Sequence, residues 1–234
     1  MKNLVRLSFS RFAESYNKEA VLQKEAAEVL GDFAGFIDGT GIDLGCGTGF
    51  LYDFLENKNV IGIDISKEMI LFYKEKNPKA VIADIEKLPF KEKSFDFAVS
   101  NFSLHWTDIE KTFLETYRVL KERGVFVFNI PFYGSLDIIE EILGIETFDF
   151  LCVPEILKSL KKAGFGIEDF FSEDFVLSFN NGYSLLSHLH KTGVAVNIKK
   201  TSLKEKREIV QKFKSYKKEA VLKYRLLFVK AYKP

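Results

Sequence analysis

The sequence predicts a single α/β domain built around a mostly parallel β-sheet. Short apolar runs that end at polar residues alternate with segments of helical period through residues 41–130, the pattern of repeated βα units. A glycine-rich turn directly follows the first of these runs. The chain has 234 residues, 47% hydrophobic and 29% charged, which suits one sizeable domain better than two.

Residues 1–35 are expected to form a helical cover ahead of the sheet. Their apolar side chains recur at three- and four-residue spacings, which predicts one or two amphipathic helices. The side chains that follow this spacing are Phe12, Tyr16, Leu22, Ala26, Val29, Leu30 and Phe33.

Residues 36–131 are expected to hold five parallel strands and the binding site. Helical segments separate most of these strands, and Ser66 is a candidate N-cap for one of the helices. Short links between such units favour a parallel sheet with right-handed crossovers. The predicted strands begin after Thr40 and at Val60, Ala80, Phe95 and Gly124, and they end at the glycine turn, Asp64, Ala83, Ser100 and Ile130.

The regular alternation of predicted strands and helices ends after Pro131. Two helices, Leu136–Leu143 and Pro154–Ala163, precede a long strand-like run, Phe165–Phe179. Two more helices then lie within residues 180–218, before a final strand, Val221–Ala231. The last two strands are expected to form a hairpin-like edge of a seven-stranded sheet, with residues 180–218 as a helical insertion over the ligand crevice.

The segment Thr40–Phe50 carries the chemistry of the predicted site. Its glycines, Gly45, Gly47 and Gly49, follow the spacing G-x-G-x-G, whereas a dinucleotide-binding turn reads G-x-G-x-x-G. Residues without a Cβ allow positive φ and let a ligand lie against the backbone amides. Asp43 precedes the turn, and a carboxylate at this place suits a cationic ligand better than a pyrophosphate.

These residues resemble the first motif of the class I S-adenosylmethionine-dependent methyltransferases. The resemblance implies a Rossmann-like fold, in which Asp43 and the turn hold the amino-acid end of the cofactor, Asp64 the ribose hydroxyls and Asp84 the adenine. Taken one at a time, these aspartates could equally be caps or strand-end residues, and Ile65 and Met69 could be core. The cofactor-binding residues expected from the resemblance are Tyr16, Asp43, Gly45, Cys46, Gly47, Gly49, Asp64, Ile65, Met69, Asp84, Ile85, Asn101 and Phe102.

A narrower resemblance is to the malonyl-[acyl-carrier-protein] O-methyltransferases of biotin synthesis. It rests on Phe12–Asn17 of the cover, Ser100–Trp106 after the fourth strand, Leu185–Gly193 of the insertion and Tyr224–Pro234 at the end. It implies methylation of the free carboxylate of a malonyl thioester on acyl carrier protein. The chain departs from that family at Ser187 and His190, where basic side chains are more usual.

Few side chains are expected to take part in the chemistry directly. The carboxylate acceptor would be ionised at pH 7, so no general base is needed. Tyr16 is a candidate lid residue, and His105 is either a substrate-positioning group or a packed histidine beside Trp106. Arg11 and Lys191 are candidate partners for the substrate carboxylate. The three histidines have no carboxylate at metal-ligand spacing, so no metal is predicted.

Charge is distributed unevenly along the chain. Residues 1–150 hold 17 basic and 25 acidic side chains, whereas residues 151–234 hold 17 and 8. The basic stretch could be a solvated helix face or could dock acidic acyl carrier protein. It consists of Lys199, Lys200, Lys204, Lys206, Arg207, Lys212, Lys214, Lys217 and Lys218.

Other functions stay open at this point. A free small molecule is an alternative acceptor, and a sensor that binds the cofactor without catalysis is an alternative of another class. RNA is disfavoured because no aromatic residues interleave the lysines. Two cysteines are too few for a disulfide framework, and there is no long apolar run, so a cytoplasmic protein that does not enter a membrane is expected.

Overall fold

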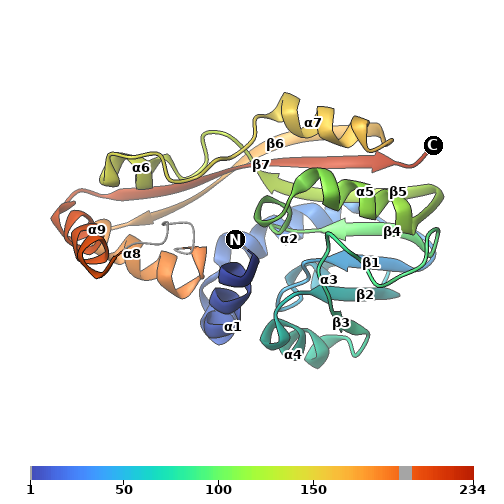
Figure 1. Cartoon of the computed structure of the whole chain (residues 1–234), viewed down its shortest axis with the longest axis horizontal. Helices are drawn as coiled ribbons and strands as arrows, with labels where there is room; N and C mark the ends of the chain where they lie inside the picture. The colour runs from blue at the N-terminus through green and yellow to red at the C-terminus, as the bar shows by residue number, and fades with distance from the viewer. Residues whose placement is uncertain (1, 195–201) are drawn as a thin grey trace.

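The computed structural model describes residues 2–194 and 202–234. One sheet runs through them in the order β3-β2-β1-β4-β5-β7-β6 (Figure 1). Strand β7 pairs antiparallel with β5 and β6, whereas the other pairs are parallel. The predicted seven-stranded, mostly parallel sheet is therefore confirmed. The strands are β1 (Gly41–Leu44), β2 (Val60–Asp64), β3 (Ala80–Ile82), β4 (Phe95–Ser100), β5 (Leu120–Pro131), β6 (Gly166–Phe179) and β7 (Ala220–Tyr232).

Helices cover both faces of the sheet. One buried cluster joins the sheet to α2, α3, α6, α8 and α9, and a second joins its other face to α5 and α7. Within the described ranges, no helix combines the length and the apolar character that a membrane span requires. The helices are α1 (Lys2–Glu19), α2 (Val21–Ala34), α3 (Phe50–Phe54), α4 (Lys67–Lys76), η1 (Leu104–Trp106, a 3-10 turn), α5 (Ile109–Val119), α6 (Asp137–Leu143), α7 (Val153–Lys162), α8 (Gly182–Lys191) and α9 (Leu203–Ser215).

Local signals in the sequence account for several element boundaries. Ser66 caps α4 as predicted, because its hydroxyl accepts a hydrogen bond from the Met69 amide at 3.2 Å. Strand β5 begins at Leu120, four residues before the predicted Gly124. An irregularity in the register allows Leu120 to pair with Phe95 ahead of the regular ladder, an interaction that apolar periodicity does not reveal.

The last two strands extend beyond the parallel part of the sheet. Residues 220–225 of β7 pair with residues 174–179 of β6 but have no partner in β5. Helices α6, α8 and α9 gather at this far end of the hairpin, on the left of Figure 1. Helix α1 lies between this group and α4, so it spans from the helical insertion to the parallel part of the sheet.

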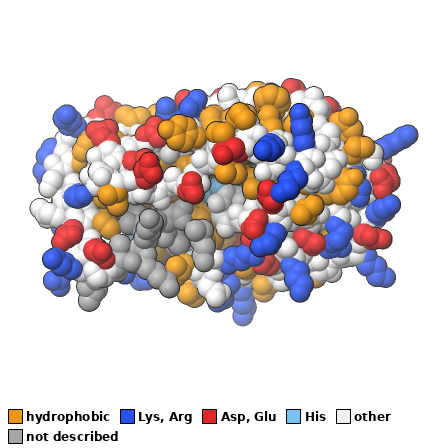
Figure 2. Space-filling model, turned by 45° about the horizontal axis from the view of Figure 1, so that its top comes forward, with side chains coloured by type: hydrophobic (Ala, Val, Ile, Leu, Met, Phe, Trp, Pro, Cys, Tyr) orange, Lys and Arg blue, Asp and Glu red, His pale blue; other side chains and the backbone are white. Residues whose placement is uncertain are grey.

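The unequal charge of the two parts of the chain does not produce a face of one sign in the view of Figure 2. Acidic and basic side chains are interspersed there, with hydrophobic side chains gathered along the upper part. The fields of interspersed charges of opposite sign largely cancel at a distance from the surface. A basic surface would therefore belong to a single helix or strand and not to a whole face of the molecule.

Candidate functional site

A cavity lies at the carboxyl ends of β1, β2 and β4, under helix α1. This is the switch point of the strand order, where open α/β sheets bind their ligands. It holds about 730 Å³ of empty space, with the solvent at its mouth included. Its wall is formed by Lys2, Val5, Phe9, Tyr16, Gly45, Gly47, Asp64, Ile65, Met69, Ala83, Asp84, Ile85, Asn101, Phe102, Ser103, Trp106 and Thr107.

The glycine turn contributes two different kinds of glycine to the site. Gly45 has φ of 68°, and a Cβ on it would lie 2.3 Å from the Cβ of Ser103. Gly47 has φ of 51°, but a Cβ there would meet nothing within 4 Å, and the residue lines the cavity. Gly45 is therefore required for packing against Ser103, whereas Gly47 leaves its backbone open to a ligand.

Asp64 is held against the turn at the end of β2. Its Oδ2 accepts a hydrogen bond from the Gly47 amide at 3.0 Å, and its Oδ1 accepts one from the Ser66 amide at 2.8 Å. Burial raises the pKa of Asp64 to about 6, although these hydrogen bonds oppose the shift. A ligand that donates hydroxyl hydrogen bonds here would favour the ionised form.

Asp43 is a buried carboxyl group without a partner. It is 1% exposed, and neither of its oxygens forms a hydrogen bond with a described residue. Burial, and next the charge of Asp64, raises the pKa of Asp43 to about 8. A buried unpaired carboxyl is costly in an empty site, but its negative charge would be stabilised by a cation bound nearby.

Asp84 lies two residues after the end of β3, in the cavity wall, and is paired with a residue that the sequence reasoning missed. Its Oδ2 accepts a hydrogen bond from Nζ of Lys2 at 2.6 Å, and Lys2 also pairs with Glu86 at 2.6 Å. Lys2 belongs to the first turn of α1 and lines the cavity. Helix α1 is thereby fixed to the loop that follows β3.

The loop after β4 is positioned by a buried amide network. Nδ2 of Asn129 on β5 donates to Oδ1 of Asn101 at 2.6 Å, and Oδ1 of Asn129 accepts from the Phe102 amide at 2.9 Å. Nδ2 of Asn101 donates to the Gln23 carbonyl at 3.0 Å. Phe102 has a φ of 54°, which is strained for a residue with a Cβ. Asn129 thus holds the strained loop at the cavity wall.

Aromatic rings close one side of the cavity. Tyr16 stacks on Phe50 at 5.8 Å between ring centroids and meets Phe9 edge-on at 5.8 Å. Phe9 in turn meets Trp106 edge-on at 5.6 Å. Burial, and next the charge of Asp64, raises the pKa of Tyr16, so it presents a neutral phenol at the cavity. This position agrees with the lid role predicted for Tyr16, which remains a prediction.

Ten of the thirteen expected cofactor-binding residues line this one cavity, and three do not. Asp43, Cys46 and Gly49 belong to the first motif but lie outside the wall. Cys46 is buried, and burial raises the pKa of its thiol, so it is a core residue with no nucleophilic character. The ten in the wall are Tyr16, Gly45, Gly47, Asp64, Ile65, Met69, Asp84, Ile85, Asn101 and Phe102.

The three expected substrate-binding residues lie outside the cavity wall. The guanidinium of Arg11 is exposed and lies 5.4 Å from the Phe12 ring centre. Nζ of Lys191 pairs with Glu19 at 2.7 Å. His105 faces a second hollow with Phe150, and burial lowers its pKa to about 3. The structure therefore does not bring these three together around one ligand.

The sequence reasoning missed most of the contribution of α1. Lys2, Val5, Phe9 and Tyr16 line the cavity, at spacings of three, four and seven residues that place them along one stripe of the helix. The spacing of Val5 and Phe9 could have revealed this stripe, but the predicted amphipathic pattern began only at Phe12. Ser103, Trp106 and Thr107, in and around η1, also line the wall.

Comparison with known proteins agrees with this geometry. A family described as "Methyltransferase domain" matches residues 42–128, which span β1 to β5. An uncharacterized protein of Methanocaldococcus jannaschii is 33% identical over 171 residues, covering 67% of this chain and 80% of its own length. Residues 42–128 of the chain therefore belong to the methyltransferase domain family.

Two further similarities concern substrate and fold. A malonyl-[acyl-carrier protein] O-methyltransferase of Hamiltonella defensa is 37% identical over 141 residues, covering 58% of this chain and 55% of its own length. The chain thus spans about half the length of the first curated relatives it matches. A Thermotoga maritima structure described as a SAM-dependent methyltransferase, possibly a histamine N-methyltransferase, has a TM-score of 0.62 and 22% identity, covering 97% of this chain and 99% of its own.

The site of this methyltransferase fits its family's cofactor. S-adenosylmethionine carries a cationic sulfonium, a ribose with two hydroxyls and an adenine. The unpaired buried carboxyl of Asp43 lies outside the cavity wall but adds a negative charge that suits a cationic ligand, and the carboxylate of Asp64, in the wall, suits the ribose hydroxyls. Gly47 leaves room for the ligand against the turn, and Asp84 can accept from the adenine amino group.

The two kinds of glycine give different expected phenotypes. Gly45→Ala is expected to lower the free energy of unfolding by about 2–4 kcal/mol, because it combines positive φ with a collision at Ser103. Gly47→Ala should cost only about 1–2 kcal/mol, from its positive φ. It should nevertheless weaken S-adenosylhomocysteine binding at least roughly tenfold, because its methyl group is added at the cavity wall. Urea unfolding and calorimetric titration measure the two effects, and equal stability losses in both variants would contradict the assignment.

Proposed function

We propose that this methyltransferase transfers the methyl group of S-adenosylmethionine to the free carboxylate of a malonyl thioester carried on acyl carrier protein, a step of biotin synthesis. The support is the similarity to a malonyl-[acyl-carrier protein] O-methyltransferase, which is 37% identical over 141 residues. The motifs after β4 and in α8 that resemble the same family lie outside the glycine turn and point to the same acceptor.

The ionisation states at the site favour a carboxylate as the acceptor. The bound cofactor supplies an electrophilic methyl group on a sulfonium, so the protein has chiefly to align the two reactants. A hydroxyl acceptor needs a base, but the pKa of about 3 makes the nearby His105 too weak a base for that task. A malonyl carboxylate is already ionised at pH 7 and needs none.

Each part of the wall has a proposed task in this reaction. Asp64 and Asp84 bind the ribose and the adenine, and the amides of the glycine turn hold the amino-acid end. Asn101 and Phe102 form the wall between β4 and the ligand, and their hydrogen bonds with Asn129 hold them there. The aromatic side of the cavity, with Tyr16, excludes water from the sulfonium.

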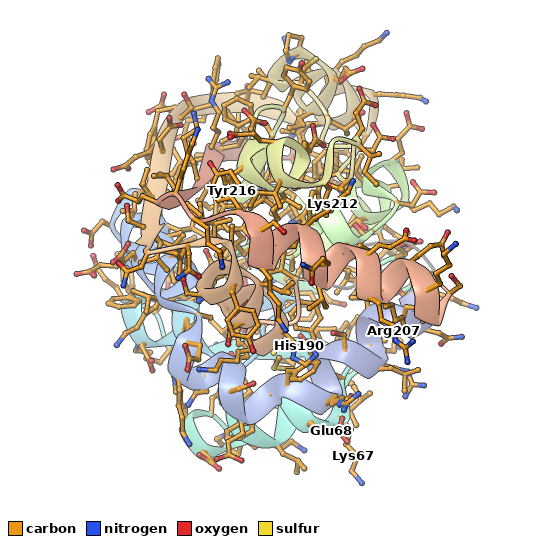
Figure 3. All side chains as sticks on the ribbon, turned by 90° about the vertical axis from the view of Figure 1, so that its left-hand side faces the viewer. Lys67, Glu68, His190, Arg207, Lys212 and Tyr216 are labelled. Carbon is orange, nitrogen blue, oxygen red and sulfur yellow. The ribbon has the colours of Figure 1, made fainter. Side chains whose placement is uncertain are left out.

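Helix α9 carries the proposed docking surface for the carrier protein. Lys204, Lys206 and Arg207 are exposed and form no ion pair with any residue that the structure describes. Lys212 instead donates to the Leu143 carbonyl at the end of α6. Figure 3 shows this division, with Lys212 on the side of α6 and Arg207 on the opposite side of α9, toward α1. Lys199 and Lys200 of the predicted basic stretch lie outside the described residues.

The acceptor is tested by incubating the purified protein with methyl-labelled S-adenosylmethionine and three separate pools. These are malonyl-acyl carrier protein, free small carboxylic acids and RNA. Label is expected on the carrier protein, in a base-labile ester. Label on small acids alone would replace the proposal with a small-molecule methyltransferase, and cofactor binding without transfer to any pool would support a sensor.

The docking surface is tested by reversing three charges on α9. The triple variant Lys204→Glu, Lys206→Glu, Arg207→Glu should lower kcat/KM for malonyl-acyl carrier protein at least about tenfold at low salt, because the carrier is acidic. Turnover of malonyl-pantetheine, which has no carrier protein, should stay within about twofold of wild type.

A matched control separates docking from net charge. Lys158, Lys161 and Lys162 are exposed on α7, so their reversal to glutamate makes the same change in net charge on another element. This control variant should keep its turnover of the carrier substrate. Equal losses in both triple variants would refute α9 as the docking surface and leave the methyl-transfer proposal standing.

A further inference from the structure

Lys2 joins two carboxylates at the edge of the cavity. Its Nζ lies 2.6 Å from Oδ2 of Asp84 and 2.6 Å from Oε2 of Glu86. Both carboxylates have a second anchor, because Oδ1 of Asp84 accepts from the Glu86 amide at 3.0 Å and Oε1 of Glu86 accepts from the Asp108 amide at 2.9 Å. Lys2 completes a set of contacts that holds the carboxylate of Asp84 by both oxygens.

The position of Lys2 makes this contact relevant to the ligand. Lys2 and Asp84 both line the cavity, whereas the Glu86 side chain is only 7% exposed and lies outside the wall. Two carboxylates this close repel each other unless a cation lies between them. The hydrogen bonds to Asp84 and Glu86 raise the pKa of Lys2 against the effect of burial, so the ammonium group stays charged at neutral pH.

Lys2 also fixes one end of α1. Farther along the helix, the hydroxyls of Ser10 and Ser66 are 3.0 Å apart, which ties α1 to the start of α4. Ser15 donates to the Lys191 carbonyl at 2.8 Å, which ties the other end of α1 to α8. Helix α1 is thus held by contacts along its length, and the Lys2 contact is the one beside Asp84.

We propose that Lys2 is a positioning residue for the adenosine end of the cofactor, which acts by orienting Asp84 and by fixing the first turn of α1 at the cavity. This inference rests on the cofactor assignment within the proposed function but does not depend on the methyl acceptor. It predicts that the contributions of Lys2 and Asp84 to cofactor affinity are not independent, because Lys2 acts through Asp84.

The test measures S-adenosylhomocysteine and adenosine binding by calorimetry, without any methyl acceptor. Lys2→Met is expected to weaken both ligands roughly fivefold to tenfold, since a charge-assisted contact is lost. Lys2→Arg retains the charge and should bind within about threefold of wild type. Lys18→Met is the control, because Lys18 also belongs to α1 but pairs with Glu14 on its exposed side, and it should bind as wild type does.

A double-mutant cycle gives the readout that a purely structural role would not produce. In an Asp84→Asn background, Lys2→Met should add less than about a twofold further loss. Unchanged binding by Lys2→Met, or losses that multiply fully in the double variant, would overturn the proposal.

The outcome is separable from that of the proposed function. If wild-type protein does not bind S-adenosylhomocysteine, the cofactor assignment fails before any variant is compared. If it binds the ligand but methylates no carrier protein, the acceptor proposal fails while the Lys2 comparison stays intact. In that case the double-mutant cycle, measured by ligand binding, still decides the role of Lys2.

Discussion

Asp43→Asn is expected to remove most of the pH dependence of S-adenosylmethionine binding. In the wild-type protein, burial and the neighbouring Asp64 raise the pKa of Asp43 to about 8, so the ligand-free carboxyl holds its proton at pH 7. A cationic ligand favours the ionised form, and binding therefore releases this proton. Affinity should rise with pH up to about pH 8, by at most about tenfold per unit. Calorimetry at pH 6, 7, 8 and 9, in buffers of different ionisation enthalpy, measures both the affinity and the protons released.

The asparagine variant should bind more weakly and with little pH dependence. Above pH 8 its affinity should be roughly 10- to 100-fold below that of wild type, because the buried negative charge is missing. The isosteric amide keeps the packing of a side chain that is 1% exposed. The explanation would be wrong if the variant kept the slope of the wild type, or if wild-type binding released no proton at pH 7.

Asp43→Asn weakens ligand binding, but it is expected to make the ligand-free protein more stable relative to wild type as the pH rises. Folding raises the pKa of Asp43 from about 4 to about 8. The stability that the protonated carboxyl contributes is therefore fully present below about pH 4 and is lost as the pH rises through about 8. Asp64 contributes in the same sense, but only up to about pH 6, the value to which burial raises its pKa. Between pH 6 and 8 the wild type should therefore lose up to about 1.4 kcal/mol per pH unit relative to Asp43→Asn. Urea unfolding at pH 6, 7 and 8 checks this, and parallel curves would contradict it.

Asn129→Leu is expected to damage both the fold and the cofactor site. Asn129 is 0% exposed, and its loss removes the donor to Oδ1 of Asn101 and the acceptor of the Phe102 amide. Leaving such buried groups unsatisfied should lower the free energy of unfolding by about 2–4 kcal/mol. The strained φ of Phe102 is then no longer supported, so the loop should relax and S-adenosylhomocysteine binding should fall more than about tenfold.

Thr116→Val is the matched control for this prediction. Thr116 is also 0% exposed, but its hydroxyl donates only to the Thr112 carbonyl within α5, and neither residue lines the cavity. It should cost about 1 kcal/mol and leave ligand binding unchanged. Urea unfolding and calorimetry are measured on both variants at one pH. Normal ligand affinity in Asn129→Leu would show that the loop holds its position without the amide network.

The sequence by itself was sufficient to predict the part of the site that lies at the carboxyl ends of the parallel strands. Asp43, Asp64 and Asp84 each lie at or just after the end of a strand, and parallel strands carry their carboxyl ends to the same edge of the sheet. Alternation of strand and helix therefore predicts that residues far apart in the chain meet there. The G-x-G-x-G spacing and the Ser66 cap are also local signals, because positive φ and an N-cap hydroxyl depend on nearby backbone alone.

Only the tertiary structure decided which other side chains reach the cavity. The direction of α1 across the sheet depends on contacts with α4 and α8, such as Ser10 with Ser66 and Ser15 with the Lys191 carbonyl. Helical period predicts which residues share a face but does not predict what that face packs against. For this reason Lys2 lines the cofactor cavity, whereas Arg11 on the same helix and Lys191 on α8 do not. The site thus combines a sheet edge determined by local pattern with a helical wall that packing alone determined.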